Sequence, residues 1–199
     1  MPDRRRQRYG DVDYDWEYRV DTTSATIRWR TRLRGLLHSP YQPVEPELFR
    51  AMLNAVDIDF TRFTFIDIGS GKGRALLLAS EYPFERILGV ELLPELNQIA
   101  RENIRKFPSH RQRCSNIEAR VEDATKISFP PQALVIFLFH PLPEADFVKF
   151  LANLSGSLER LPRPIYLLYA HPVFAGMVEG CRWVKRIGGS EQYALFGPG

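Results

Sequence analysis

The chain has 199 residues, 44% of them hydrophobic, with 27 basic side chains against 24 acidic ones. This length and apolar content fit one domain with a substantial core and leave no room for two domains of ordinary size. The longest unbroken apolar run, residues 133–139, is far shorter than the ~20 residues that a membrane-spanning helix needs, so we expect no transmembrane segment.

Two further features bear on compartment and covalent cross-links. The basic residues at the start of the chain are not followed by an apolar stretch, so we expect no secretory signal and a cytoplasmic protein. Cys114 and Cys181 lie 67 positions apart, and neither belongs to a CxxC pattern or to a ligand spacing with histidine. We therefore predict two buried free thiols and no metal site.

Residues 1–34 carry the whole net charge of +3, because they hold nine arginines and six acidic residues, whereas residues 35–199 hold 18 of each sign. Such an end is usually solvated, although an arginine-rich segment can also contact RNA or another anion. Residues 1–20 contain four aromatic side chains, Tyr9, Tyr14, Trp16 and Tyr18. We interpret residues 1–20 as a flexible arm whose aromatic side chains can dock on a surface. A short helix is expected after it, within residues 24–37.

Three prolines within residues 40–46 mark a stiff linker between this arm and the rest of the chain. We divide the chain into an arginine-rich arm with its proline-rich linker, residues 1–43, and one domain, residues 44–199. Pro46 suits the first turn of a helix, and apolar residues repeat at helical spacing from there to Asp57.

From residue 63 onward, apolar runs alternate with segments of helical spacing. The predicted strands are residues 63–68, 86–91, 116–121, 133–139 and 164–169, and the predicted helices are residues 74–82, 93–107 and 147–158. This alternation predicts a doubly wound α/β fold, with a mostly parallel sheet covered by helices on both faces and the apolar run 133–139 at its centre. After a short helix within residues 173–180, strand-like runs at 183–187 and 192–196 predict an antiparallel hairpin, which brings the sheet to seven strands.

A glycine-rich loop, Asp67-Ile-Gly-Ser-Gly-Lys-Gly-Arg74, joins the first predicted strand to the next helix. Glycines at alternate positions suit a backbone that turns tightly and approaches a ligand closely. The loop is not a P-loop, because Lys72 is followed by Gly73 rather than by Ser or Thr. It also misses the dinucleotide fingerprint G-x-G-x-x-G, because Arg74 stands where the third glycine belongs.

The loop resembles the first motif, D-x-G-x-G-x-G, of class I S-adenosylmethionine-dependent methyltransferases, with Asp67, Gly69, Gly71 and Gly73 at the motif positions. The resemblance, which extends over residues 44–199, implies that the loop, Ser70 included, lies against the methionine part of S-adenosylmethionine. It also implies that Asp67 helps to orient the amino group of this cofactor. The negative charge of Asp67 agrees with this cofactor, because an acidic residue at a strand end attracts the ammonium and sulfonium groups of S-adenosylmethionine. It would repel the pyrophosphate of a dinucleotide.

Two further acidic positions resemble later motifs of this family. Glu91 ends the second strand, 24 residues after Asp67, where a carboxylate can accept hydrogen bonds from ribose hydroxyls. After the third strand, Asp123, with Glu122 as the alternative, matches the residue that binds the adenine amino group, and the backbone of Ala124 would meet the ring. We expect these acidic side chains at the carboxyl ends of neighbouring strands.

The acceptor of the methyl group is expected outside the carboxyl end of the fourth strand, where the sequence reads Phe139-His140-Pro141. Many amino-group methyltransferases place Asn or Asp where this chain has His140. We predict His140 as a catalytic base, with His171 after the fifth strand as a second candidate, and a loop-capping role is the alternative for both. Tyr41 either packs on the bound cofactor or belongs to a linker that docks the N-terminal helix.

Together these residues predict a methyltransferase, similar to bacterial members of the class, that transfers the methyl group of S-adenosylmethionine to a protein side chain or a small molecule. An RNA methyltransferase that uses the basic arm is one alternative, and a non-catalytic module that binds S-adenosylmethionine is another. The acceptor and the oligomeric state do not follow from these residues.

Overall fold

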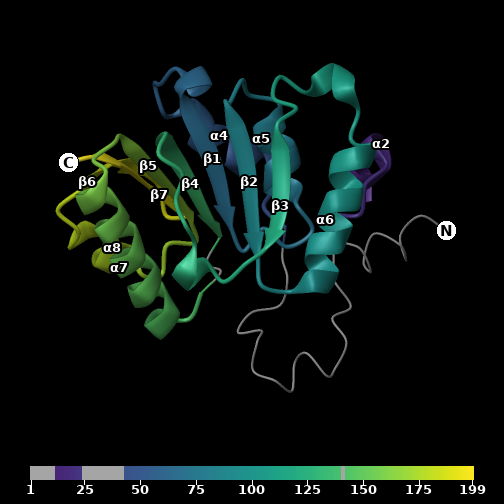
Figure 1. Cartoon of the computed structure of the whole chain (residues 1–199). Coiled ribbons are helices and arrows are strands. Elements are labelled where there is room, and N and C mark those ends of the chain that lie inside the picture. The colour runs from purple at the N-terminus through teal and green to yellow at the C-terminus, as the bar shows by residue number, and fades with distance from the viewer. Residues whose placement is uncertain (1–11, 24–42, 140–141) are drawn as a thin grey trace.

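The centre of the fold is a sheet to which the described residues of this computed structural model, 12–23, 43–139 and 142–199, contribute seven strands. Five strands run parallel to one another: β1 (Phe63–Ile68), β2 (Arg86–Glu91), β3 (Ile117–Val121), β4 (Ala133–Phe139) and β5 (Ile165–Ala170). β7 (Tyr193–Pro198) is antiparallel to both of its neighbours, β5 and β6 (Val184–Gly189). The strand order is β3-β2-β1-β4-β5-β7-β6 (Figure 1), so the predicted sheet, with β4 at its centre, is confirmed.

Helices cover both faces of this sheet (Figure 1). One face carries α4 (Pro46–Asn54), α5 (Arg74–Ser80) and α6 (Pro94–Lys106), and the other carries α7 (Glu144–Arg160) and α8 (Ala175–Glu179). Short 3-10 turns stand at η1 (Phe60–Arg62), η2 (Ser109–Arg111) and η3 (Ala124–Lys126).

The strand side chains alternate between two apolar clusters, one on each face of the sheet. Phe65 of β1 packs with Phe49 of α4, whereas its neighbour Ile66 belongs to the cluster that contains Phe150 of α7. Because both faces are covered, all six residues of β1 are buried. Helix α7 begins three residues before the predicted start, directly after Pro143, whose φ of −65° suits the entry to a helix.

The N-terminal arm differs from the expected flexible segment over the part that the structure describes. Residues 12–18 form helix α2 (Val12–Tyr18), which lies beside α6 (Figure 1). Tyr14 and Tyr18 are buried, and the Tyr18 ring lies 5.3 Å from the ring of Phe107. Of the four aromatic side chains that were expected to dock, Tyr14 and Tyr18 thus pack against the domain, whereas Trp16 is 69% exposed. Tyr9 and the helix expected within residues 24–37 lie outside the described residues.

Both cysteines are free, but only Cys114 is buried, whereas Cys181 is partly exposed. Within residues 12–23, 43–139 and 142–199, no helix has the length and apolar character needed to cross a membrane.

Substituting Gly89 of β2 by alanine is expected to destabilise the fold by about 1–3 kcal/mol, because the interior tolerates little added volume. An added Cβ would lie 2.6 Å from Leu76 Cδ1 and 2.8 Å from Ser70 Oγ, both buried. Urea unfolding measures this change. Gly156→Ala in α7 is the matched control, since its Cβ would meet only the guanidinium of Arg160 at 3.4 Å, and it should stabilise the helix by about 0.5–1 kcal/mol. Equal unfolding midpoints for Gly89→Ala and the wild type would contradict this packing.

Candidate functional site

The carboxyl ends of β1, β2 and β3 lie side by side at one edge of the sheet. Ile68 of β1 pairs with Val90 of β2, and Glu91 of β2 pairs with Val121 of β3. The glycine loop after β1, the acidic end of β2 and the turn after β3 are therefore neighbours in space. This is the arrangement that the spacing of Asp67, Glu91 and Asp123 predicts.

The glycine loop has a backbone that other residues would adopt only with strain. Gly69, Gly71 and Gly73 have φ values of 77°, 52° and 86°, in the left-handed region that favours glycine. The backbone N–H groups of Gly69 and Ser70 both donate to the carbonyl of Val90, at 2.8 and 3.0 Å. The loop therefore turns around the end of β2 before α5 begins.

Glu91 links this loop to the following segment. Its Oε2 accepts a hydrogen bond from the Gly71 N–H at 2.8 Å, and its Oε1 accepts one from the Leu93 N–H at 2.9 Å. Burial raises the pKa of Glu91, while the backbone N–H groups of Leu93, Gly71 and Leu92 act in the opposite direction. Since each carboxylate oxygen has two lone pairs, both can still accept a hydrogen bond from a hydroxyl group of a ligand.

Asp67 is a buried acid with 3% of its surface exposed. Burial, and after it the charge of Glu91, raises the pKa of Asp67 to about 8. A carboxylate in this position is costly unless a positive group lies close to it. The site therefore favours a cationic ligand beside Asp67.

Ser70 provides a second sign that the loop is incomplete without a ligand. Its hydroxyl is buried and has no hydrogen-bond partner among the residues that the structure describes. Buried hydroxyls normally have partners, so an unmatched one beside three glycines indicates a position where a polar ligand group would sit.

Asp123 has a structural role in the described protein. Its Oδ1 accepts hydrogen bonds from the N–H and the hydroxyl of Thr125, at 2.9 and 2.7 Å, and so caps η3, which begins at Ala124. Its Oδ2 lies 3.2 Å from the ammonium group of Lys126. These contacts, with that of Thr125 the strongest, lower the pKa of Asp123, which stays ionised near neutral pH.

The two other predicted site residues, His140 and Tyr41, lie outside the described residues. His171, the second candidate base, is exposed and has a φ of 48°, which is unusual for a residue other than glycine. Its N–H donates to the carbonyl of Gln192 at 2.8 Å, and its ring stands edge-on to Phe139, with 5.2 Å between ring centres.

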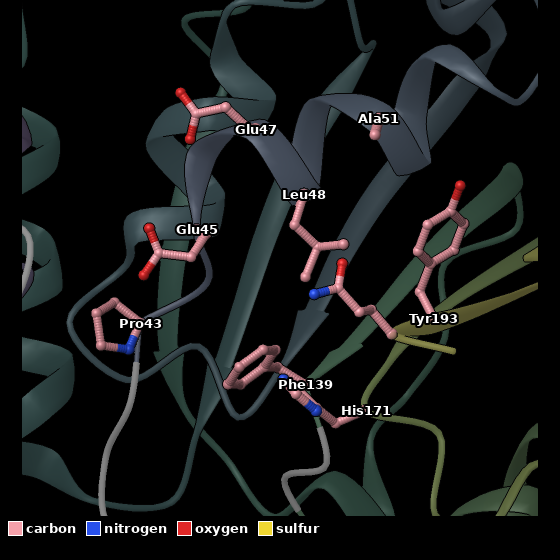
Figure 2. Close-up of a pocket in the computed structure, with 9 residues that line it drawn as sticks. Pro43, Glu45, Glu47, Leu48, Ala51, Phe139, His171 and Tyr193 are labelled. Atoms are coloured by element: carbon pink, nitrogen blue, oxygen red, sulfur yellow. The ribbon is translucent and has the colours of Figure 1, made fainter. Parts of the chain in front are cut away.

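His171 lines an open pocket of about 430 Å³ between α4 and the ends of β4, β5 and β7. Leu48 points from α4 toward the space beside Phe139 and His171, and Tyr193 stands on the side opposite Pro43 (Figure 2). The described lining residues are Pro43, Glu45, Glu47, Leu48, Ala51, Phe139, His171, Gln192 and Tyr193. Two of these side chains are carboxylates, and none belongs to Lys or Arg.

Phe139 of the pocket lies one strand away from the start of the glycine loop. Leu138 of β4 pairs with Ile68 of β1. The next residues along the two strands, Phe139 in the pocket and Gly69 in the loop, are therefore neighbours. Adjacent strands lie about 4.8 Å apart, so a molecule in the pocket and a ligand on the loop can be in contact.

Sequence reasoning missed a polar side chain outside the loop that holds the loop backbone in place. The side-chain amide of Asn103 in α6 donates to the carbonyl of Lys72 at 2.9 Å and to that of Asp21 at 2.7 Å. The only sequence signal was the presence of two cations in the loop, Lys72 and Arg74, and a local pattern cannot indicate which distant segment contacts them.

The chain is similar to known proteins in part of its sequence and in its fold. Residues 65–160, from β1 to the end of α7, match a family model described as a methyltransferase domain. No curated protein is similar enough to count as a match.

Several solved structures share the fold. A structure described as a predicted N6-adenine-specific DNA methylase from Listeria monocytogenes has a TM-score of 0.58 and 14% identity, with 83% of this chain and 54% of that chain covered. TrmN from Thermus thermophilus has a TM-score of 0.53 and 23% identity, with 84% and 50% covered. An rRNA methylase from Streptococcus thermophilus has a TM-score of 0.50 and 11% identity, with 79% and 98% covered. The family match and the fold confirm the resemblance to class I methyltransferases.

Asp67→Asn is expected to change how stability depends on pH. The pKa of Asp67 is raised from 3.8 to about 8, so between these values the folded protein holds a proton that the unfolded chain has lost. The contribution of this group to stability therefore falls as the pH rises toward 8, and the non-titrating asparagine should remove that part of the slope.

Urea unfolding of the unliganded protein at several pH values between about 5 and 9 tests this linkage. Asp57→Asn, at an exposed position, is the control and should keep the slope of the wild type. If Asp67→Asn also kept that slope, the buried carboxyl would not titrate as described.

Proposed function

We propose that this chain is an S-adenosylmethionine-dependent methyltransferase that acts on a protein side chain or a small molecule. The cofactor supplies a methyl group on a sulfonium, and direct transfer of that group depends mainly on the alignment of the two reactants. The observation that carries the proposal is the carboxylate of Glu91, held by the glycine loop at the end of β2 with both oxygens still able to accept hydrogen bonds.

The proposed roles follow the order of the strand ends. The loop from Gly69 to Gly73, with the unmatched hydroxyl of Ser70, would hold the methionine part, and Asp67 would attract its ammonium group. Glu91 would bind the ribose hydroxyls. Asp123 would meet the adenine amino group through Oδ2, which contacts Lys126 but has room for a further hydrogen bond, since Oδ1 already accepts two from Thr125. Ala124 would lie against the ring.

The pocket supports an acceptor without phosphate groups. Its described lining offers the carboxylates of Glu45 and Glu47 and the apolar surfaces of Leu48 and Phe139. Carboxylates repel phosphates and attract amines or guanidinium groups. His140 and His171 stay candidate bases, and a cytoplasmic location stays a prediction.

RNA remains the second candidate acceptor, because residues 1–34 carry the net charge of +3. The structural neighbours include an rRNA methylase and a predicted DNA methylase, but at 11% and 14% identity they share the fold and do not indicate the acceptor of this chain.

Glu91→Ala is expected to weaken the binding of S-adenosylmethionine by at least about tenfold, because it removes charge-assisted hydrogen bonds and frees the loop. Isothermal titration calorimetry measures the affinity. Glu95→Ala, at an exposed position in the first turn of α6, is the matched control and should bind as the wild type does. Unchanged affinity in Glu91→Ala would remove the basis of the cofactor assignment.

Methyl transfer from labelled S-adenosylmethionine to a fractionated lysate identifies the acceptor class. We expect label in a fraction that resists ribonuclease, and less label with the double variant Glu45→Gln/Glu47→Gln at equal cofactor affinity, because the acceptor would lose its attraction to the pocket. Label that ribonuclease removes would instead support the RNA alternative, and cofactor binding without any labelled product would support a non-catalytic module.

The RNA alternative has a sharper control in the arginines before α2, namely Arg4, Arg5, Arg6 and Arg8. Substituting these four by glutamine keeps the sequence of helix α2 unchanged, whereas removing residues 1–34 would also remove α2 and its contacts. RNA affinity that rises at low salt and is lost in this variant would favour RNA as the acceptor.

A further inference from the structure

The glycine loop contains two buried cations that its proposed function does not explain. Lys72 and Arg74 are only 4% and 1% exposed. Cations in a loop that binds a positively charged cofactor would repel it unless their charge is compensated. The groups that contact Lys72 and Arg74 therefore bear on cofactor binding.

Lys72 reaches the segment that follows α2. Its ammonium group donates to Asp21 Oδ1 at 2.6 Å and to the carbonyl of Thr23 at 2.8 Å. The Asp21 side chain is 60% exposed and the Lys72 side chain 5% exposed, so the pair stands at the boundary between the loop and solvent. Asp21 thus forms an ion pair with Lys72, one of the two cations of the loop.

Arg74 is enclosed by the same segment. Its Nε donates to Thr22 Oγ1 at 2.7 Å, a terminal nitrogen lies 3.4 Å from Asp15 Oδ1, and its guanidinium carbon lies 4.8 Å from the centre of the Tyr14 ring. Asp15 is itself held in place, because its Oδ2 accepts hydrogen bonds from the N–H groups of Thr22 and Thr23, at 2.8 and 2.9 Å.

Asn103 joins this segment to the loop. Its Oδ1 accepts from the Asp21 N–H at 2.9 Å, while its amide group donates to the carbonyls of Asp21 and Lys72. One side chain of α6 therefore fixes the backbone of both pieces. A shift of the segment moves the carbonyl of Lys72, between the glycines at 71 and 73.

We propose that Tyr14, Asp15 and residues 21–23, here called the N-terminal clamp, are a built-in part of the cofactor site, in which Asp15 and Asp21 act as positioning residues. Their two negative charges compensate the two positive charges of Arg74 and Lys72 and hold the loop in its binding conformation. This inference rests on the proposed function, and it extends the cofactor site to a segment about 50 positions before the loop in the sequence.

The clamp has an electrostatic signature that a purely structural role lacks. S-adenosylmethionine carries a net charge of +1, whereas S-adenosylhomocysteine, which lacks the sulfonium, is neutral overall. Removing a carboxylate from the clamp leaves extra positive charge beside the loop. The affinity for S-adenosylmethionine should therefore fall more than the affinity for S-adenosylhomocysteine.

The test compares Asp21→Asn with Glu17→Gln by calorimetric titration of both ligands into the full chain. Glu17 belongs to α2 as well, but its ion pair is with Arg111, at 3.2 Å, away from the loop. Relative to the wild type, Asp21→Asn should raise the ratio of the two dissociation constants, S-adenosylmethionine over S-adenosylhomocysteine, by about two- to fourfold, the effect of one unit charge in a partly hydrated site. Glu17→Gln should leave the ratio unchanged.

The double variant Asp21→Asn/Lys72→Met tests the cause. It removes both members of the pair, so the ratio should return toward the wild-type value even if both affinities are lower. An unchanged ratio in Asp21→Asn, or no recovery in the double variant, would overturn the compensating role.

Amide hydrogen exchange of the unliganded protein separates this inference from the proposed function. Exchange at residues 69–74 should be faster in Asp21→Asn than in Glu17→Gln, because the clamp no longer holds the loop. Absence of binding of either ligand to the wild type would count against the proposed function alone. Equal loop exchange in the two variants would count against the clamp, whatever the ligand data show.

Discussion

Two hydrogen bonds to one carboxylate determine the shape of the candidate site. Glu91 accepts from the N–H groups of Gly71 and Leu93, so the loop after β1 and the turn into α6 are bound to the same side chain. The left-handed glycines allow the loop to reach this position, and the bonds to the carbonyl of Val90 keep it there. The edge of the sheet is thereby prepared for a ligand that contacts β1 and β2 together.

The charges at this edge are balanced across distant parts of the chain. Asp67 is a buried acid whose pKa is raised to about 8, and the loop after it holds two buried cations, Lys72 and Arg74. Asp67 makes no ion pair with Lys72 or Arg74 among the described contacts. The cations contact Asp15 and Asp21 instead, and the proposed function assigns Asp67 and Glu91 to the cationic cofactor.

The sequence predicts the sheet and the loop well, because both depend on local patterns. Apolar runs locate β1, β2 and β4 to the residue, and the alternate glycines after Asp67 indicate the ligand loop. The docking of α2 could not be predicted, since it depends on pairings such as that of Asp21 with Lys72, 51 positions apart, which leave no local signal. The sequence does not distinguish a capping role of Asp123 from ligand binding, whereas the contacts with Thr125 show the cap.

The central claim is that S-adenosylmethionine binds along the carboxyl ends of β1, β2 and β3. Ultraviolet cross-linking of radiolabelled S-adenosylmethionine, followed by mapping of the labelled peptides, tests this claim most directly. We expect label within residues 67–74, 91–96 or 121–126, and competition by unlabelled S-adenosylhomocysteine. Label confined to peptides elsewhere in the chain, such as those of α7 or β6, would contradict it.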